Sequence, residues 1–275
     1  MIAHEEALPA GYDTAGVLAF LRLRAVPGCE EATAHGLRRA LALPRGPGLA
    51  DLDVRDGRLR IVLELEDAGD EAAAVAACRR LLALDVPAPQ AAAALGRDPD
   101  LAPLVRAAPG RRLPGCATGA ELAVRAVLGQ QVTVAAARTL AGRLVARHGG
   151  AAPGGLRTFP GPRTLLDAMA PDEPAMPGAR RAALRAVLEA TATGSLDLEP
   201  GGDPAAARAA LVALKGIGPW TAEYVVARAL AEPDAWPPRD VGLRHALARL
   251  GLEEPAAARW SPWRSFAVAH LWASL

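Results

Sequence analysis

The stretch "LKGIGPWTAEYVVARAL", residues 214–230, differs from the Ala-, Leu- and Arg-rich helical sequence around it. It places Gly216 and Gly218 two residues apart, contains Lys215, the only lysine of the chain, and resumes a helical pattern at Pro219. Glycine can adopt positive φ and lets another backbone approach closely, and proline suits the first position of a helix. The stretch therefore predicts two helices joined by a tight turn over residues 205–231.

Such a turn has two interpretations. The second helix would begin with free N–H groups at the positive end of its dipole, which can bind a phosphate without any side chain. Lys215 would add a positive charge beside them. The alternative is an ordinary corner between two helices, in which the glycines only end one helix and allow the next to begin.

The rest of the chain divides into two parts. Residues 47–67 contain "LADLDV" and "LRIVLEL", which alternate apolar and polar residues on either side of "RDG", and this pattern predicts a β-hairpin. "HGLRRALAL", residues 35–43, is ambiguous between strand and helix. With the helical patterns that flank these segments, residues 10–86 form a predicted antiparallel α+β domain. Residues 87–275 show only helical patterns broken by Gly and Pro, so the predicted fold is mainly α with a small N-terminal α+β domain.

The net charge of +1 points to no particular partner. The charge is uneven, however, because residues 101–150 carry seven arginines and one glutamate. Such a block is either a phosphate-facing surface or a set of solvated helical faces. Charge alone favours the second interpretation.

Cysteine usage and hydropathy exclude several classes of protein. Cys29, Cys78 and Cys116 are widely separated and lack C-x-x-C spacing, so the chain cannot supply the four cysteines of an iron–sulfur or zinc site. Their number and spacing are typical of buried thiols in a reducing compartment. No apolar run is long enough to span a membrane, and the acidic N-terminal "MIAHEEALPAGYD" lacks the apolar segment of a signal peptide.

A wider pattern favours the phosphate-binding interpretation of the turn. L-x-G-[IV]-G-x-x-T-A, here beginning at Leu214, resembles the helix–hairpin–helix of base-excision DNA glycosylases, and Asp240 follows in "AWPPRDVGLRHAL". Three further stretches are similar to the 3-methyladenine DNA glycosylase II (alkylbase glycosylase) family: "GYDTAGVLAFLRLRAV", "RLPGCATGAELAVRAVLGQQVTVAAARTLAGRLV" and "RWSPWRSFAVAHLW". The resemblance runs from about residue 11 to 272. It implies an α+β domain packed beside a two-part helical glycosylase domain, with the substrate cleft between the two helical parts.

The resemblance assigns the catalytic role to Asp240. Breaking an N-glycosidic bond builds positive charge on the sugar, and a carboxylate fixed in a poorly hydrated cleft stabilises that charge and can orient the attacking water. Asp240 also precedes a helical run, so it is equally placed to be a helix N-cap. The two roles are compatible.

Four aromatic residues match substrate-binding positions of the family: Trp220, Tyr224, Trp272 and, less closely, Phe20. A base must leave the DNA stack to reach such a cleft, and alkylated purines often carry positive charge, which aromatic faces attract. The alternative for each of these residues is ordinary core packing.

The same resemblance implies four DNA-binding residues. Lys215, Gly216 and Gly218 form the hairpin turn, and Gln131 in "LGQQVTV" falls where the family places the wedge that fills the gap left by the flipped nucleotide. Gln131 is as well explained as a surface residue at a helix end, and the sequence does not decide between the two.

Lysine and cysteine usage predict the mechanistic class and the cofactors. Bifunctional glycosylase/lyases of this superfamily carry a Schiff-base lysine in the second hairpin helix, where this chain has Trp220. We therefore expect a monofunctional enzyme that uses water and has no iron–sulfur cluster. The resemblance also implies a monovalent cation held by the carbonyls of Val212, Leu214 and Ile217, although no side chain indicates one.

The sequence thus predicts a glycosylase that excises alkylated purines such as 3-methyladenine and 7-methylguanine from double-stranded DNA. We expect it to act as a monomer in the bacterial cytoplasm, without a membrane partner. Two alternatives remain open, namely a non-catalytic helix–hairpin–helix protein that binds damaged DNA and a glycosylase for deaminated or oxidised bases. The sequence does not define the lesion spectrum, the turnover rate, inducibility or fusion to a methyl-transfer domain.

Overall fold

The computed structural model describes residues 1–275 and contains a five-stranded antiparallel sheet with the strand order β1-β5-β4-β3-β2. The predicted hairpin is β4 and β5, joined at Asp56 and Gly57, which both have positive φ as a two-residue type I′ turn requires. The ambiguous "HGLRRALAL" is strand β3. The strands are β1 (Ile2–Ala7), β2 (Glu30–Ala32), β3 (Gly36–Ala42), β4 (Pro47–Arg55) and β5 (Arg58–Leu65).

Two strands were not predicted from the sequence. β1 occupies the N-terminal segment and pairs with β5 from Ile2 to Ala7, so the sheet begins before residue 10, the start of the predicted α+β domain. Ile2 is the only strongly apolar residue of β1. An edge strand that faces solvent on one side needs few apolar residues. β2 has only three residues, too few for an alternating pattern. The boundaries 10–86 and 87–275 stay a prediction.

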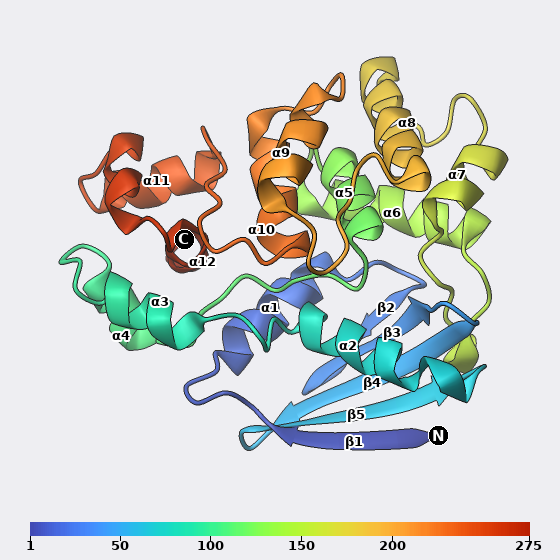
Figure 1. Cartoon of the computed structure of the whole chain (residues 1–275), viewed down its shortest axis with the longest axis horizontal. Helices are drawn as coiled ribbons and strands as arrows, with labels where there is room; N and C mark the ends of the chain where they lie inside the picture. The colour runs from blue at the N-terminus through green and yellow to red at the C-terminus, as the bar shows by residue number, and fades with distance from the viewer.

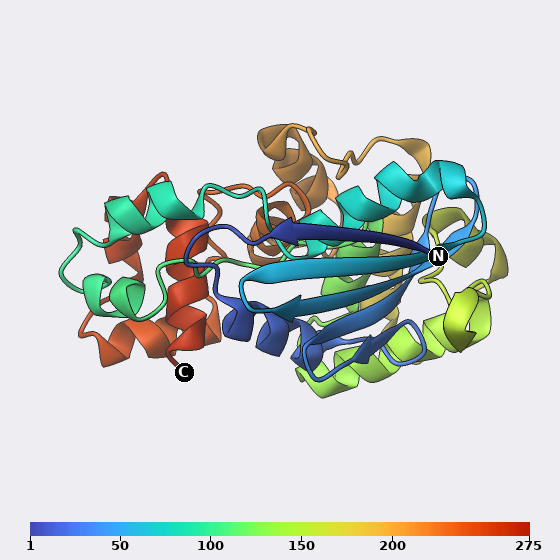
Figure 2. The ribbon, with the colours of Figure 1, turned by 90° about the horizontal axis from the view of Figure 1, so that it is seen from below.

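Two helices, α1 (Thr14–Arg24) and α2 (Glu71–Leu81), pack on one face of the sheet. Their apolar side chains, such as Leu18 and Leu81, join the inward residues of the strands in one hydrophobic core. Figure 2 shows the sheet from below with both helices on its far side. This layer lies against the helical part of the molecule (Figure 1).

The helical part has two further hydrophobic cores. The larger one is formed mainly by α5 (Gly119–Leu128), α6 (Val134–His148), α7 (Pro162–Ala168), α8 (Gly178–Thr193), α9 (Pro204–Ala213) and α10 (Pro219–Ala229). The smaller one is formed by α3 (Ala88–Leu95), α4 (Ala102–Ala107), α11 (Val241–Arg249), the 3₁₀ segment η3 (Glu254–Trp260) and α12 (Arg264–Ala273). Figure 1 shows the smaller group at the far end of the molecule from α7 and α8, with α10 between them. No helix is long and apolar enough to cross a membrane.

The three cysteines are free and buried, as expected. Burial raises the pKa of Cys29 and Cys78 to about 12 and that of Cys116 to about 11. A thiol reacts as its thiolate, so at neutral pH none should react with a charged disulfide reagent in the native protein, while all three should react in denaturant. The absorbance of the released thiol measures both. Stoichiometric labelling of the native protein would contradict the burial of these side chains.

Candidate active site

The quoted stretch forms the predicted pair of helices, α9 and α10, with a turn from Leu214 to Gly218. Gly216 has φ +90°, and a Cβ built on it would lie 2.8 Å from the Cβ of Ala183 in α8. Gly218 is different, since its φ is −93° and a Cβ there would meet nothing within 4 Å. Gly216 is therefore needed for the fold of the turn, whereas a side chain at Gly218, the N-cap of α10, would enter open space. Lys215 is exposed beside this space.

A neighbouring turn braces the hairpin. Gln130, between α5 and α6, donates from Nε2 to the carbonyl oxygen of Gly216 at 3.1 Å and to Oγ1 of Thr221 at 3.2 Å. The next residue, Gln131, is exposed and has φ +57°, so its side chain projects from the brace into solvent. This places Gln131 and the hairpin turn on adjacent segments. Sequence reasoning missed Gln130, although it stands beside Gln131.

The arginine-rich block 101–150 is not one continuous surface. Arg106, Arg143 and Arg147 are exposed, and five of the seven arginines bond to other groups of the protein. Arg111 pairs with Asp13, Arg112 donates to backbone carbonyls, Arg125 to Glu30 and Glu121, Arg138 to the Ala25 carbonyl and Arg147 to Glu173.

Asp240 is the N-cap of α11, as its position predicted. Its Oδ1 accepts the backbone N–H of Leu243 at 2.7 Å. It also accepts hydrogen bonds from two indoles, from Trp220 Nε1 to Oδ2 at 2.7 Å and from Trp272 Nε1 to Oδ1 at 3.0 Å. The carboxylate thus joins the first turn of α10 to α12 through three donors, and its orientation is fixed.

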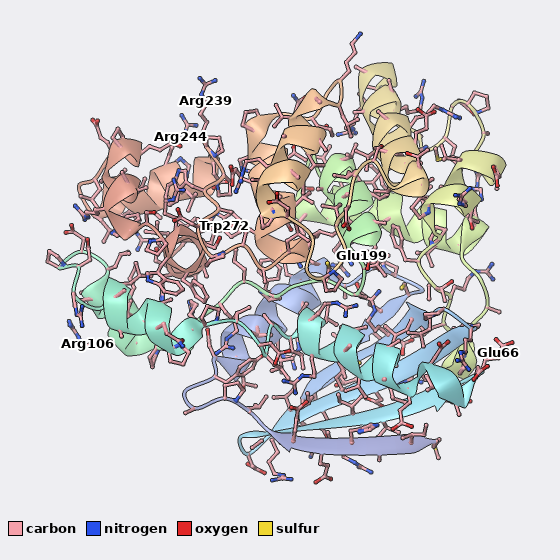
Figure 3. All side chains as sticks on the ribbon, viewed as in Figure 1. Glu66, Arg106, Glu199, Arg239, Arg244 and Trp272 are labelled. Carbon is pink, nitrogen blue, oxygen red and sulfur yellow. The ribbon has the colours of Figure 1, made fainter.

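The segment that leads to Asp240 is anchored on both sides. Arg264 makes two hydrogen bonds of 2.8 Å to the carboxylate of Asp234. Oε1 of Glu254 accepts Trp236 Nε1 at 3.1 Å and the backbone N–H of Arg239 at 2.9 Å. Arg239 has φ +59°, an uncommon conformation for a non-glycine residue, and its hydrogen bond to Glu254 helps to hold it. The side chain of Arg239 points outward near that of Arg244 (Figure 3).

The predicted aromatic residues meet beside Asp240. The rings of Trp220 and Tyr224 stack with centroids 5.3 Å apart and planes inclined by 8°, and Tyr224 lies 6.3 Å from Trp272 at a tilt of 49°. Trp272 lies between α12 and α10 (Figure 3). Asp240 and these three rings line a cavity of about 460 Å³ between the two helical cores. A flat, neutral or cationic ring fits such walls by stacking.

Phe20 is not in this cavity. It lines an adjoining pocket on α1, which shares Arg24 and Trp272 with the cavity. The guanidinium of Arg24 lies 3.7 Å above the Phe20 ring centroid. The structure therefore brings together Asp240, Trp220, Tyr224 and Trp272. It leaves Phe20 in the adjoining pocket.

The inner wall of the cavity contains arginines that sequence reasoning missed. Arg24, Arg125 and Arg228 line it, and Arg228 Nη1 donates to the Tyr224 hydroxyl at 2.5 Å. Burial alone would raise the pKa of Tyr224, but the charges of these three arginines outweigh it and hold that pKa below its usual value. Only Arg228 carried a signal in the sequence, because it lies two helical turns after Trp220 in the quoted stretch.

A glycine beside the carboxylate was also missed. A Cβ on Gly242 would lie 3.1 Å from Oδ1 of Asp240 and 3.4 Å from the Trp272 indole. A side chain there would crowd both groups, which explains the glycine.

Comparison with known proteins finds relatives of this chain. Residues 8–118 match the family model described as the AlkA N-terminal domain. The chain is 45% identical over 274 residues to the "Probable bifunctional transcriptional activator/DNA repair enzyme AlkA" of Mycobacterium tuberculosis, covering 94% of this chain but 54% of that protein. The chain therefore spans about half the length of this relative.

Two other comparisons extend over nearly whole chains. DNA-3-methyladenine glycosylase 2 of Escherichia coli is 34% identical over 272 residues, covering 95% of this chain and 93% of that protein. The solved 3-methyladenine DNA glycosylase from Archaeoglobus fulgidus superposes with a TM-score of 0.82 at 22% identity, over 98% of this chain and 97% of that one. The predicted helix–hairpin–helix glycosylase fold is thus confirmed. With a third of its residues shared with the E. coli enzyme over almost its full length, this chain belongs to the AlkA family of DNA repair glycosylases, the DNA-3-methyladenine glycosylases 2.

Proposed function

We propose that this protein is a monofunctional DNA glycosylase that hydrolyses the N-glycosidic bond of alkylated purines in double-stranded DNA, the first step of base excision repair. The observation that carries the proposal is the Asp240 carboxylate, fixed by two indole N–H groups and one backbone N–H at the wall of an aromatic cavity. The names of the E. coli and A. fulgidus proteins support 3-methyladenine as a substrate.

The proposed reaction uses each part of the site. The flipped base enters the cavity and stacks on Trp220, Tyr224 or Trp272, and the sugar stays at the Asp240 end. As the bond from C1′ to the base nitrogen breaks, its electron pair leaves with the base, and the Asp240 carboxylate stabilises the positive sugar. Water then adds to C1′ and gives up a proton.

DNA binding is assigned to the hairpin. The first N–H groups of α10 have no backbone acceptor, the space beside Gly218 is open, and these groups would bind a phosphate next to the flipped nucleotide. Lys215 adds one exposed positive charge, and the exposed Gln131 would enter the gap that the base leaves. We propose that the protein binds as a monomer.

The proposed monovalent cation fits the oxygens at the end of α9. The carbonyls of Val212 and Ile217 accept no backbone hydrogen bond, and that of Leu214 accepts only the N–H of Ile217, at 3.0 Å. Carbonyls at a helix end have no partner within their own helix, so these three could ligate a hard cation. Such an ion would add positive charge to the hairpin that faces the phosphate.

The experiment that tests the proposed function is the release of bases from methylated DNA. The protein is incubated with duplex DNA treated with a methylating agent, and the released bases are identified by chromatography and mass spectrometry. We expect 3-methyladenine and 7-methylguanine. Tight binding without release of any base would favour a non-catalytic protein that binds damaged DNA. Release of oxidised or deaminated bases alone would favour a glycosylase for those bases.

The product strand should remain unbroken. Trp220 occupies the helix position of the lyase lysine, and the only lysine, Lys215, is exposed in the hairpin turn. We therefore expect full-length strands on a denaturing gel until alkali or an abasic-site endonuclease is added. A covalent adduct trapped by borohydride through Lys215 would contradict this, and Lys215→Arg, which cannot form an imine, is the control.

A further inference from the structure

Two positive charges lie at the deep end of the cavity without a carboxylate to neutralise them. Arg24, at the end of α1, makes no ion pair; it lines the cavity together with Arg125 and Arg228, and its guanidinium lies over Phe20. Arg228 is only 7% exposed and binds neutral oxygens, the carbonyls of Pro114 at 2.7 Å and Gly115 at 2.8 Å and the Tyr224 hydroxyl. A buried charge without a counter-ion is costly, and functional sites are where such groups gather.

The surrounding charges do not cancel this excess. Behind the cavity, Arg39 pairs with Glu30 and Glu121 at 2.7 Å, and Arg125 binds the same two carboxylates at 3.3 and 2.7 Å. This group contains two arginines and two glutamates and is neutral by itself. Arg24 and Arg228 therefore remain as net positive charge. Arg228 and Arg24, together with Arg125, hold the pKa of Tyr224 below its usual value although burial acts to raise it.

The negative and positive groups lie at opposite ends of one helix. Along α10, Trp220 in the first turn binds Asp240, Tyr224 follows one turn later, and Arg228 lies in the last turn. Eight residues of helix span roughly 12 Å. The first turn belongs to the hairpin, so the sugar of a DNA-bound nucleotide would lie near Asp240 and its base would reach toward Arg24 and Arg228.

This polarity matches the charge movement of the proposed reaction, on which the inference rests. When the bond from C1′ to the base nitrogen breaks, both electrons go to the base and the sugar becomes positive. Water supplies hydroxide to C1′, and its proton goes to solvent or to the base. We propose that Arg24 and Arg228 stabilise the departing base, so that this site accelerates the loss of neutral lesions as well as cationic ones.

The two lesion classes should respond differently to the arginines. A neutral base such as hypoxanthine leaves as an anion, so positive charge lowers its barrier and leaves its binding nearly unchanged. A cationic base such as 7-methylguanine is repelled when bound, and the repulsion is relieved as it becomes neutral. For the cationic base, the same arginine therefore weakens binding and speeds the chemical step.

The test uses Arg24→Gln, which removes the charge and keeps hydrogen-bonding capacity, with Arg24→Lys as the charge-conserving variant. Single-turnover rate constants and half-saturating enzyme concentrations are measured on duplexes with one hypoxanthine or one 7-methylguanine. Arg106→Gln is the matched control, because Arg106 is exposed on α4, far from Trp272 (Figure 3). Circular dichroism and thermal unfolding verify the fold of each variant.

For Arg24→Gln we expect hypoxanthine excision to slow roughly tenfold, the size expected for a unit charge about 12 Å from the breaking bond at an effective dielectric constant near 20. The half-saturating enzyme concentration should stay unchanged. With 7-methylguanine, the half-saturating enzyme concentration should fall, because the bound cation is no longer repelled. The single-turnover rate constant should also fall. Arg24→Lys should restore most of the wild-type rate constants and half-saturating concentrations. Arg106→Gln should change neither quantity. Equal losses on both lesions with unchanged half-saturation, or no rescue by lysine, would overturn the inference. A wild-type protein that releases neither base would overturn the proposed function itself.

Discussion

Replacing Asp240 with Asn should abolish most of the excision activity while the protein stays folded. Asn caps helices about as well as Asp, so α11 should still begin at Val241. The negative charge opposite the sugar cation is lost, however, and an oriented charge in a dry site contributes roughly 3 kcal/mol or more, about a hundredfold in rate. Single-turnover excision measures this loss, and binding to abasic-analogue DNA verifies that the variant still recognises its product.

The structure adds a detail that the sequence could not supply. Asp240 accepts indole N–H groups on both oxygens, whereas Asn offers one oxygen and one NH₂ group. If its oxygen keeps Leu243 N–H and Trp272, the NH₂ group faces the Trp220 N–H and that hydrogen bond is lost, which costs about 1 kcal/mol. Trp220→Phe removes the same hydrogen bond without removing the charge. Its rate defect should therefore be much smaller than that of Asp240→Asn.

Asp203→Asn is the matched control for the cap. Asp203 is the exposed N-cap of α9 and accepts the N–H of Ala205 at 2.8 Å, outside the cavity. The Asp203→Asn variant should keep full activity. The Asp240→Asn defect should be larger for neutral hypoxanthine than for 3-methyladenine and 7-methylguanine, since cationic bases leave more easily. Full single-turnover activity in folded Asp240→Asn would return Asp240 to the role of a helix cap.

The hairpin was predictable because its signals are local. Two glycines at fixed spacing, a proline at the first helical position and a helical pattern on each side lie within one short stretch, and chain conformation there follows from the residues themselves. The β4–β5 hairpin was predictable for the same reason, since strict alternation surrounds Asp56 and Gly57.

The cavity was only partly predictable because its walls come from distant segments. The resemblance supplied Asp240 and its aromatic neighbours, but the donation of both indoles to one carboxylate depends on how α12 packs on α10. Arg24 and Arg228 come from α1 and α10 and meet only in the folded protein. In the sequence Arg24 is one arginine among many, and only its place in the quoted stretch, two helical turns after Trp220, distinguishes Arg228.

Substituting the two glycines of the hairpin should give different defects, although from sequence alone they appeared equivalent. Gly218→Val should fold normally, because φ −93° suits any residue and the added side chain enters open space. That space is where a phosphate would approach the first turn of α10, so DNA affinity should fall roughly tenfold or more for every sequence. Gly216→Val should instead lower the free energy of unfolding by about 2 kcal/mol or more, from positive φ and the contact with Ala183.

The matched control for this pair is Gly161→Val, because Gly161 also precedes a proline at the start of a helix, α7, and a Cβ added to it would likewise meet nothing within 4 Å. It reproduces the local backbone change without the hairpin. Fluorescence anisotropy on duplexes of two unrelated sequences separates a general phosphate contact from base recognition, and chemical denaturation separates either from loss of fold. If Gly218→Val binds both duplexes as tightly as Gly161→Val, no phosphate approaches the first turn of α10. The hairpin would then be a corner between helices, and DNA binding would have to be assigned to another surface.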